Sequence, residues 1–292
     1  MVDNYLSVMP VELLLEIGEY LDLPDIVNIS LINIEMKKLV RSTPWRHTID
    51  LCKIDEIRHH VIENYRFTNY HFYMTGEENN LSVVEITDNE LVHLKKCLSL
   101  RIESTKITGK NLAYLKKCSL IHLDSVNIND DDLFYLSQCK KVKLYRLNIT
   151  GKGLVHLSKC IAISIIDCNN IENDCLKYLS NCLYVYISSS KITDDGLRYL
   201  GKCHTVRLHY CDITDDGLRY LANCHTVELY YCNRITINGL GYLSNCHKVQ
   251  IINNNITKNA LSHLPKTNIE TNYNYTGGTS KITTFENFMH CD

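Results

Sequence analysis

The sequence predicts an α/β solenoid: a horseshoe with a parallel β-sheet on its inner side and short helices on its outer side, behind an N-terminal module of three helices. Two observations lead to this fold class. Eight cysteines recur at intervals of 21 or 22 residues, and a fixed interval of this length is the sequence signature of a solenoid. The first 46 residues lack that period and carry three short amphipathic stripes instead.

Each repeat unit follows its cysteine with the same apolar pattern. After Cys203, Val206 and Leu208 alternate with polar residues, which is the period of a strand with one buried face. Ile213 and a Leu-x-x-Leu pair come next, and the Thr and Asp between them are typical of a helix start. A strand and one helical turn cannot enclose a core alone, so the units must stack. The ladder cysteines are Cys97, Cys118, Cys139, Cys160, Cys182, Cys203, Cys224 and Cys246.

The unit C-x-x-[VIL]-x-[LI]-x-x-[CNST]-x-I-T-D-x-G-L-x-x-L-x-x-C resembles the cysteine-containing subclass of leucine-rich repeats. About eight units match, and the resemblance assigns residues 76–292 to a leucine-rich-repeat horseshoe. A distorted last unit is expected from Thr267 onward. The degenerate ends are expected to include Leu81, Ile86, Leu91 and Leu94 at the start, and Phe285, Phe288 and Cys291 at the close.

The cysteines are expected to be reduced and buried. Ladder positions lie in a line at the strand spacing of about 4.8 Å, so four thiolates cannot converge on one zinc ion at about 2.3 Å. In the dipeptides Cys203–His204, Cys224–His225 and Cys246–His247, adjacent residues point to opposite faces of a strand. Disulfides need Cβ atoms about 3.8 Å apart, closer than parallel neighbours normally bring them. We therefore expect no metal and no cofactor, and thiols that pack as small hydrophobic groups.

The first 46 residues are expected to form helices over 10–21, 24–31 and 34–40. Pro10 and Pro24 suit the first position of a helix, where no amide hydrogen bond is needed. The segment MPVELLLEIGEYLDLPDIVNISLI, with a trailing Trp45, resembles the F-box family. Three helices in so few residues leave apolar surface uncovered, which indicates a partner. The alternative is a helical cap that shields the first repeat.

An F-box followed by cysteine-type leucine-rich repeats is a known family architecture. The resemblance implies a substrate receptor of an SCF-type, cullin-based ubiquitin ligase, whose F-box docks on a Skp-family adaptor while the repeats hold a target protein. Tethering accelerates a reaction performed elsewhere, so the chain is expected not to be an enzyme. Periodicity leaves open which apolar residues face the adaptor and which face the module's own core. The candidates are Pro10, Leu13, Leu14, Ile17, Leu21, Leu23, Ile26 and Leu31.

The target is expected to bind the concave face of the sheet. Side chains two, four and six or seven positions after each cysteine point out of that face. An aromatic stripe with Arg nearby has the composition of an interface core. The alternative is that tyrosine only stiffens exposed strands, where it is favoured. The candidates are Tyr145, Tyr184, Tyr186, Arg207, His209, Tyr210, Tyr230 and Tyr231.

Residues 47–75 are expected to join the module to the solenoid. A short strand after Trp45 and a helix around residues 54–64 are expected in this junction. His59 and His60 are interpreted as surface residues of that helix.

Composition argues against several partners. Lys and Arg number 31 against 33 Asp and Glu, for a net charge of −2, so neither nucleic acid nor an anionic membrane is an expected partner. No apolar run reaches the length of a membrane span. The N-terminus also lacks the pattern of a secretory signal, so a reducing compartment, cytoplasm or nucleus, is expected.

Rival functions are an enzyme, a small-ligand receptor, and a protein-binding scaffold or inhibitor without a ligase role. Phosphate-loop, zinc-protease and serine-hydrolase motifs are missing from the sequence. A small-ligand site would need a denser basic cluster than Lys141, Lys143 and Arg146. Abundant Asn, Ile, Lys and Tyr suggest an AT-rich genome, and the chain is similar to F-box receptors of giant amoebal viruses, which would place it in host cytoplasm.

Overall fold

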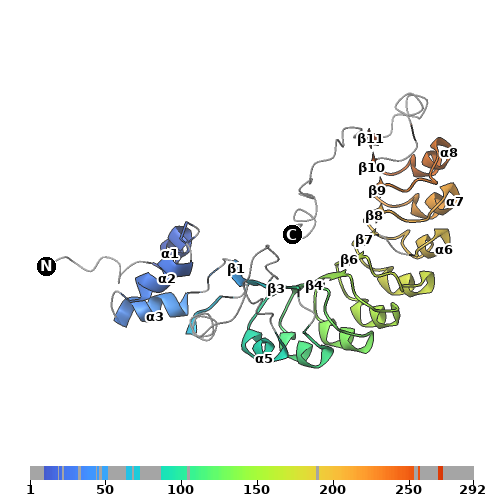
Figure 1. Cartoon of the computed structure of the whole chain (residues 1–292). Coiled ribbons are helices and arrows are strands. Elements are labelled where there is room, and N and C mark those ends of the chain that lie inside the picture. The colour runs from blue at the N-terminus through green and yellow to red at the C-terminus, as the bar shows by residue number, and fades with distance from the viewer. Residues whose placement is uncertain are drawn as a thin grey trace, which may run out of the picture.

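The computed structural model describes residues 10–18, 20–21, 23–31, 34–43, 45, 48–51, 64–67, 69–72, 87–103, 106–188, 191–252, 256 and 269–271. These residues form a curved solenoid with a helical module at its N-terminal end (Figure 1). Strands follow the inner side of the arc and helical segments follow the outer side. The solenoid expected from the cysteine spacing is therefore confirmed.

The helical module consists of α1 (Val11–Gly18), α2 (Leu23–Ser30) and α3 (Ile34–Ser42). The three expected helices are present, although α1 ends at Gly18, a residue with poor helix propensity, where the expected helix ran on to residue 21. Ile26, Met36 and Val40 are buried within the module. Trp45 Nε1 donates a hydrogen bond to the Val40 carbonyl at 2.9 Å, which fixes the chain after α3.

A single parallel sheet runs along the solenoid. Its strands pair in chain order, and equivalent positions of successive units lie side by side, as Val206 does beside Val227. In the described part of the chain the sheet has eleven strands: β1 (Thr48–Leu51), β2 (Asn69–Phe72), β3 (Ser99–Glu103), β4 (Leu120–Asp124), β5 (Lys141–Tyr145), β6 (Ala162–Ile166), β7 (Tyr184–Ser188), β8 (Thr205–His209), β9 (Thr226–Tyr230), β10 (Lys248–Ile252) and β11 (Ile269–Thr271).

Short helical segments form the outer layer. Each is one or two turns long, because the unit leaves only a few residues between strands. The Leu-x-x-Leu pair faces the core, and Leu218 and Leu221 are both fully buried. The segments are α5 (Asp88–Leu91), η2 (Val92–Leu94), η3 (Gly109–Leu115), η4 (Asp131–Leu136), η5 (Lys152–Leu157), η6 (Asn173–Leu179), α6 (Asp194–Leu197), α7 (Asp215–Leu218), η7 (Arg219–Leu221), α8 (Ile237–Leu240) and η8 (Gly241–Leu243), where η marks 3₁₀ geometry.

The sheet begins earlier than the sequence predicts. The short strand expected after Trp45 is β1, and both β1 and β2 lie within residues 47–75, the expected junction. β2 pairs with β3 in the parallel register of the later strands, so residue 76 is too late a boundary for the sheet. The expected helix around 54–64, with both of its histidines, lies outside the described residues except at Asn64, which is helical.

The degenerate ends are described in part. Leu91 and Leu94 are buried as repeat positions require, and β11 adds a strand to the sheet after Thr267. Expectations for Leu81, Ile86, Phe285, Phe288 and Cys291 fall outside the described residues.

Residues 64–67 connect the module to the sheet. The Tyr65 hydroxyl and Ser30 Oγ lie 2.6 Å apart and share a hydrogen bond. Arg66 Nη1 donates to the Ser42 carbonyl at 3.0 Å. The Phe67 ring stacks on Trp45 with centroids 6.1 Å apart. As a result, one continuous hydrophobic core extends from the module through the repeats.

The ladder cysteines pack beneath the strands as reduced thiols, as expected. The twelve cysteines among the described residues are free and buried. Cys139 Sγ donates to the Cys118 carbonyl, and Cys160 Sγ to the Cys139 carbonyl, each at 3.1 Å. Burial, reinforced by the neighbouring thiol, raises the pKa of Cys139 to about 12. Thiols in such an environment act as packing groups.

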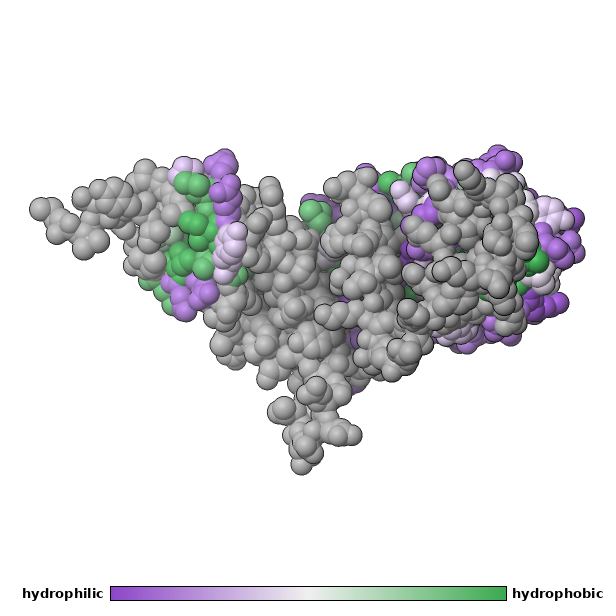
Figure 2. All heavy atoms as spheres, turned by 90° about the horizontal axis from the view of Figure 1, so that it is seen from above, coloured by the Kyte–Doolittle hydropathy of each residue, from purple (hydrophilic) through white to green (hydrophobic). Residues whose placement is uncertain are grey.

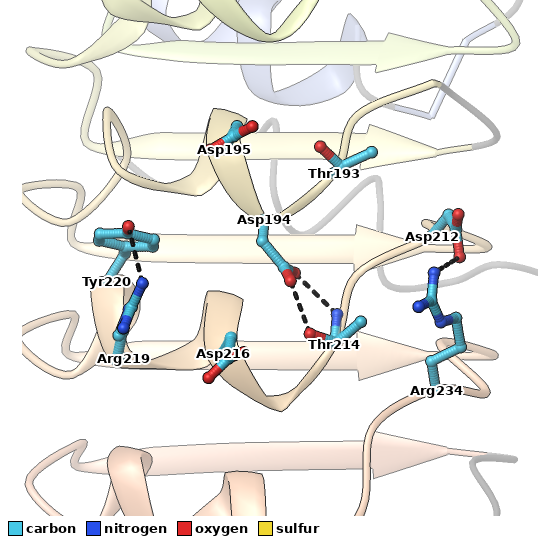
Figure 3. Close-up of a pocket in the computed structure, with 9 residues that line it drawn as sticks. All are labelled: Thr193, Asp194, Asp195, Asp212, Thr214, Asp216, Arg219, Tyr220 and Arg234. Carbon is cyan, nitrogen blue, oxygen red and sulfur yellow. Dashed lines mark hydrogen bonds and ion pairs between the residues drawn. The ribbon is translucent and has the colours of Figure 1, made fainter.

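Side chains at the helix starts tie each unit to the next. Asp194 accepts hydrogen bonds from the Thr214 backbone N–H at 2.7 Å and from its hydroxyl at 2.6 Å (Figure 3). The sequence predicts that Thr caps its own helix, but in α6 and α7 the Thr side chain makes no such bond. Thr214 binds the preceding unit instead, because that carboxylate also reaches its N–H. The contact recurs as Asp88–Thr108, Asp130–Thr150, Asn173–Thr193 and Asp215–Thr236.

Candidate functional site

The helical module presents large apolar side chains to solvent, which we call the helical face. Its members are Leu13, Ile17, Tyr20, Leu31 and Ile34, with exposed fractions of 49, 41, 89, 70 and 73%. Figure 2 shows hydrophobic residues gathered on the surface of the module. Because other side chains already fill the module's own core, the helical face is surplus to its folding. An exposed apolar surface of this kind marks an interaction site.

The structure divides the candidate adaptor contacts into two groups. Pro10, Leu13, Ile17 and Leu31 are exposed, while Leu21 is half-buried and packs against the core. Ile26 is only 1% exposed; it is a core residue of the module, and its candidacy as a surface contact is corrected. The side chains of Leu14 and Leu23 lie outside the described set.

Two members of the helical face, Tyr20 and Ile34, are missing from the sequence-based set. Tyr20 follows the end of α1, and Ile34 opens α3. Both lie at helix ends, where the apolar stripe of a helix gives no prediction. Their residue type could have identified them, because a large apolar side chain outside the stripe is not needed to fill the module's core.

The concave face carries three rows of outward side chains, one from the first, third and fifth position of each strand. The third positions form the middle row, in which Tyr186 lies beside Arg207 and Arg207 beside Glu228. The fifth positions include His209 beside Tyr230. Residues of one row are neighbours at the strand spacing of about 4.8 Å. Parallel register therefore brings the aromatic and charged candidates of β7–β9 together.

The centre of this region is a buried ion pair enclosed by aromatic rings. Arg207 Nε lies 2.6 Å from Glu228 Oε2, and the two side chains are 11% and 9% exposed. The guanidinium carbon is 5.7 Å from the Tyr186 ring centre and 5.9 Å from that of Tyr230. The Tyr230 hydroxyl lies 3.0 Å from Glu228 Oε2 and 2.9 Å from Gln250 Oε1, and its single proton is shared between these two acceptors. Charge is neutralised within the cluster, and its geometry is fixed.

A stack of rings lies beside Tyr230, with the His209 and Tyr230 ring centroids 5.5 Å apart. The Tyr210 and Tyr231 rings stack with centroids 4.6 Å apart, and His209 stacks on Tyr210 at 4.5 Å. Both tyrosines have positive φ, 52° and 56°, a conformation that costs a bulky residue about 1 kcal/mol or more. The position just after the strand requires it, since Arg146 and Asp167 share this φ. Burial and the nearby Arg207 lower the pKa of His209, so it is neutral at pH 7.

We call the set on β7–β9 the aromatic patch: Tyr186, Arg207, His209, Tyr210, Glu228, Tyr230 and Tyr231. Tyr210 is its most exposed aromatic ring, at 54%, whereas Tyr186 is only 6% exposed. The expectation that Tyr186 lies in an exposed stripe is corrected: Arg207 and His209 close over its ring. Tyr186 acts as the floor of the patch.

The other two aromatic candidates lie apart from this patch. Tyr145 is on β5, separated from β7 by β6, and its ring contacts Arg146 at 4.6 Å. Tyr184 starts β7, and its ring centroid lies 5.8 Å from that of His204. Both are half-buried. The sequence thus placed these side chains on the correct face but did not separate the patch from its neighbours.

An open pocket of about 350 Å³ lies on the other side of the repeats, between α6 and α7 (Figure 3). Both of its arginines have partners within the lining: Arg234 binds Asp212 at 2.9 Å, and Arg219 donates to the Tyr220 hydroxyl at 3.2 Å. Among the described residues, no group of three or more His, Cys, Asp or Glu is placed to hold a metal ion. No helix in that same part of the chain is long and apolar enough to span a bilayer.

Comparison with known proteins finds similarity only among solved structures; no protein-family model and no curated protein matches the chain. An internalin (inlF) from Listeria monocytogenes has 21% identity and a TM-score of 0.49 over 67% of this chain and 60% of its own. Internalin C2 (inlC2) of the same species has 17% identity and a TM-score of 0.46 over 66% of this chain and 88% of its own. The chain thus spans 60% of the length of the first. We base the repeat fold on the unit spacing and the strand register.

Proposed function

We propose that the chain is the substrate-recognition subunit of an SCF-type, cullin-based ubiquitin ligase. In this proposal the helical face docks on a Skp-family adaptor, and the concave face holds a protein target for ubiquitination. The observation that carries the proposal is the helical face itself, which stays exposed on a module whose core is already closed. The module's resemblance to the F-box family identifies the adaptor as the partner that would cover it.

The size of the helical face is compatible with docking. The exposed fractions of its five side chains equal about three fully exposed large residues, or roughly 5–10 kcal/mol of apolar burial. That gain is of the same order as the entropic cost of association. Polar contacts around the apolar centre would then set the net affinity.

The chain's role in the reaction would be to position the target. A target held on the aromatic patch is kept near the ubiquitin carrier, and tethering raises its effective concentration without any chemistry from this chain. The aromatic patch suits that role because exposed tyrosines beside a fixed hydrogen-bonded cluster are typical of binding hot spots. A reducing compartment, the cytoplasm or nucleus, suits the free thiols.

Copurification from cells that express the full chain tests the adaptor. The wild-type chain should retain a Skp-family adaptor and cullin, and the variant Leu13→Asp/Leu31→Asp should lose both by at least about tenfold, because buried charge without a partner is strongly unfavourable. Asn28→Asp is the matched control, since Asn28 is exposed on α2 and lies outside the helical face. Far-UV circular dichroism checks that all variants fold.

The alternative function is a scaffold or inhibitor that uses only the repeats. A wild-type chain that captures a target while retaining neither adaptor nor cullin would favour it and refute the ligase role. The target surface is tested separately by Tyr210→Ala/Tyr231→Ala, with Tyr242→Ala as the control, because Tyr242 is 46% exposed on η8. Only the double variant should lose the target, and it should keep the adaptor.

A further inference from the structure

One edge of the solenoid carries most of the exposed apolar side chains of the repeats. Of the eight large apolar side chains that are exposed on the described repeats, seven lie between five positions before and one position after a ladder cysteine. Each such stretch holds the end of a helical segment, a turn and the residue before the next strand. We call the edge formed by residues 92–98, 113–119, 134–140 and 155–161 the lysine rim. Its exposed apolar members are Leu98, Tyr114, Phe134, Val155 and Ile161.

The lysine rim is also strongly cationic. Its four stretches contain no Asp or Glu, and no described carboxylate forms an ion pair with any of its exposed lysines. The carboxylates of these units lie instead where the helical segments begin, at the opposite ends of the strands, as Asp88 and Asp130 do. The whole-chain charge of −2 therefore conceals a local excess of positive charge. The exposed lysines are Lys95, Lys96, Lys116, Lys117, Lys140 and Lys159.

The members of the lysine rim form one continuous surface. Lys95 Nζ lies 5.1 Å from the ring centre of Tyr114 in the next unit, and the Phe134 ring lies 5.5 Å from that of His156. The backbone N–H of Ile161 donates to the Lys140 carbonyl at 2.8 Å. At the strand spacing of about 4.8 Å, the first and fourth units are about 14 Å apart. This span is close to the Debye length of about 10 Å at 0.1 M salt, so the fields of the lysines add.

Neither local structure nor a protein partner accounts for this composition. Lysine is favourable at a helix end because it complements the helix dipole, but that effect places no apolar side chain in solvent. A protein interface has a centre depleted in lysine, whereas lysines and apolar side chains alternate throughout the lysine rim. A membrane interface suits that mixture, since apolar side chains enter the headgroup region while lysine stems extend and keep their ammonium groups in water.

We propose that the lysine rim binds the surface of an anionic phospholipid membrane. The ammonium groups would lie at the level of the lipid headgroups, and Leu98, Phe134 and Ile161 would enter the interface between them. A polybasic surface of this size is of the kind that binds acidic lipids. The association would be peripheral and reversible, because single apolar side chains rather than a spanning helix enter the lipid. This inference concerns a different surface from the helical face and the aromatic patch and goes beyond the proposed ligase role.

Partition of the full-length chain into lipid vesicles tests the proposal. Vesicles of phosphatidylcholine with about 30% phosphatidylserine should bind the chain at least about tenfold more tightly than phosphatidylcholine alone at about 0.1 M NaCl. About 1 M NaCl, where the Debye length is about 3 Å, should remove most of that difference. Equal partition into the two vesicles would overturn the proposal. Binding to soluble polyglutamate without binding to phosphatidylserine vesicles would also overturn it and would assign the rim to an acidic protein segment.

Matched lysine variants locate the contact. Lys96→Gln/Lys117→Gln should weaken binding to phosphatidylserine vesicles at least about tenfold, because each lysine near an anionic surface contributes about fivefold. Lys110→Gln/Lys152→Gln is the control with the same change of charge, since both of these lysines are exposed near helix starts; its binding should stay within about twofold of wild type. Equal weakening by the two pairs would refute a defined rim.

Two further measurements keep the test independent of those variants. Leu98→Gln/Phe134→Gln should weaken vesicle binding severalfold at unchanged charge, and circular dichroism checks that it folds. In the wild-type chain, phosphatidylserine vesicles should slow acetylation of Lys96, Lys117 and Lys140, but not of Lys110 or Lys152, as measured by mass spectrometry. Uniform acetylation of all five lysines in the presence of bound vesicles would overturn the assignment.

Discussion

Replacing Asp130 should destabilise the solenoid more than replacing any exposed carboxylate near it. Asp130 accepts hydrogen bonds from the backbone N–H groups of Thr150 at 2.9 Å, Gly151 at 3.0 Å and Gly153 at 2.8 Å, and from the Thr150 hydroxyl at 3.0 Å. The contact requires close approach, because a Cβ on Gly153 would lie 2.2 Å from the Asp130 carbonyl oxygen. One carboxylate thus satisfies four donors of the following unit, three backbone N–H groups and one hydroxyl.

The magnitude follows from the number and environment of these bonds. A hydrogen bond to a charged group contributes about 1.5–3 kcal/mol when buried, but Asp130 is only partly buried, and water competes for its oxygens. We expect Asp130→Ala to lower the free energy of unfolding by about 2–4 kcal/mol. Asp131→Ala is the control: Asp131 is exposed, and its loss should cost within about 0.5 kcal/mol.

The same site gives a pH dependence. Burial raises the pKa of Asp130, but the hydrogen bonds from Gly153, Thr150 and Gly151 outweigh it, and the net pKa lies below the ordinary value. Its stabilisation is therefore complete above the unfolded pKa of about 4 and is lost as the pH falls through the folded value. Wild type should lose stability more steeply than Asp130→Asn below about pH 4. Urea denaturation followed by circular dichroism measures both effects; equal stability of the Asp130 and Asp131 variants would refute the reasoning.

Two further predictions concern the buried groups. Burial, reinforced by neighbouring thiols, raises the pKa of Cys139, Cys160 and Cys203 from 9.0 to about 12, so native labelling by iodoacetamide should be slower by about a thousandfold through thiolate fraction alone; mass spectrometry with and without urea measures this, and rapid native labelling would contradict it. Glu228→Gln leaves the Arg207 charge buried and should cost about 3–5 kcal/mol, whereas Arg207→Met/Glu228→Leu should recover most of the loss. Urea denaturation of both variants measures these changes in stability. If Glu228→Gln left stability unchanged, water would already screen the charge of Arg207.

The repeats were predictable from the sequence because stacked units bury the same positions of each unit, and this produces a regular period of apolar residues. A cysteine, two alternating apolar residues and a Leu-x-x-Leu pair can be buried together only if each unit places them identically, so β3–β10 follow directly from the spacing. The same alternation placed Arg207 and Tyr230 on the concave face. Arg101 and His122 occupy the same outward slot in earlier units, so the alternation places them on the concave face as well.

Other features depend on three-dimensional neighbours that no period encodes. Tyr186 points outward like Lys143, yet it is buried because Arg207 happens to be long enough to cover it. Ile26 belongs to the module core because it lies in α2, which packs against α3, and is 1% exposed. Strands β1 and β2 escaped prediction as repeats because their units lack the ladder cysteine spacing, and only pairing with β3 reveals their membership.

The continuous core between the module and the repeats fixes the distance between the helical face and the aromatic patch. Trp45 and Phe67 attach the helical module to the sheet. A partner bound to α1–α3 and a target bound to β7–β9 are therefore separated by a fixed number of strands. Adding or deleting one unit would change that separation by about 4.8 Å. It would also rotate the bound target by the angle between two successive units of the solenoid. Under the proposed ligase role, unit number would decide which lysines of the cargo become modified, while leaving capture itself untouched.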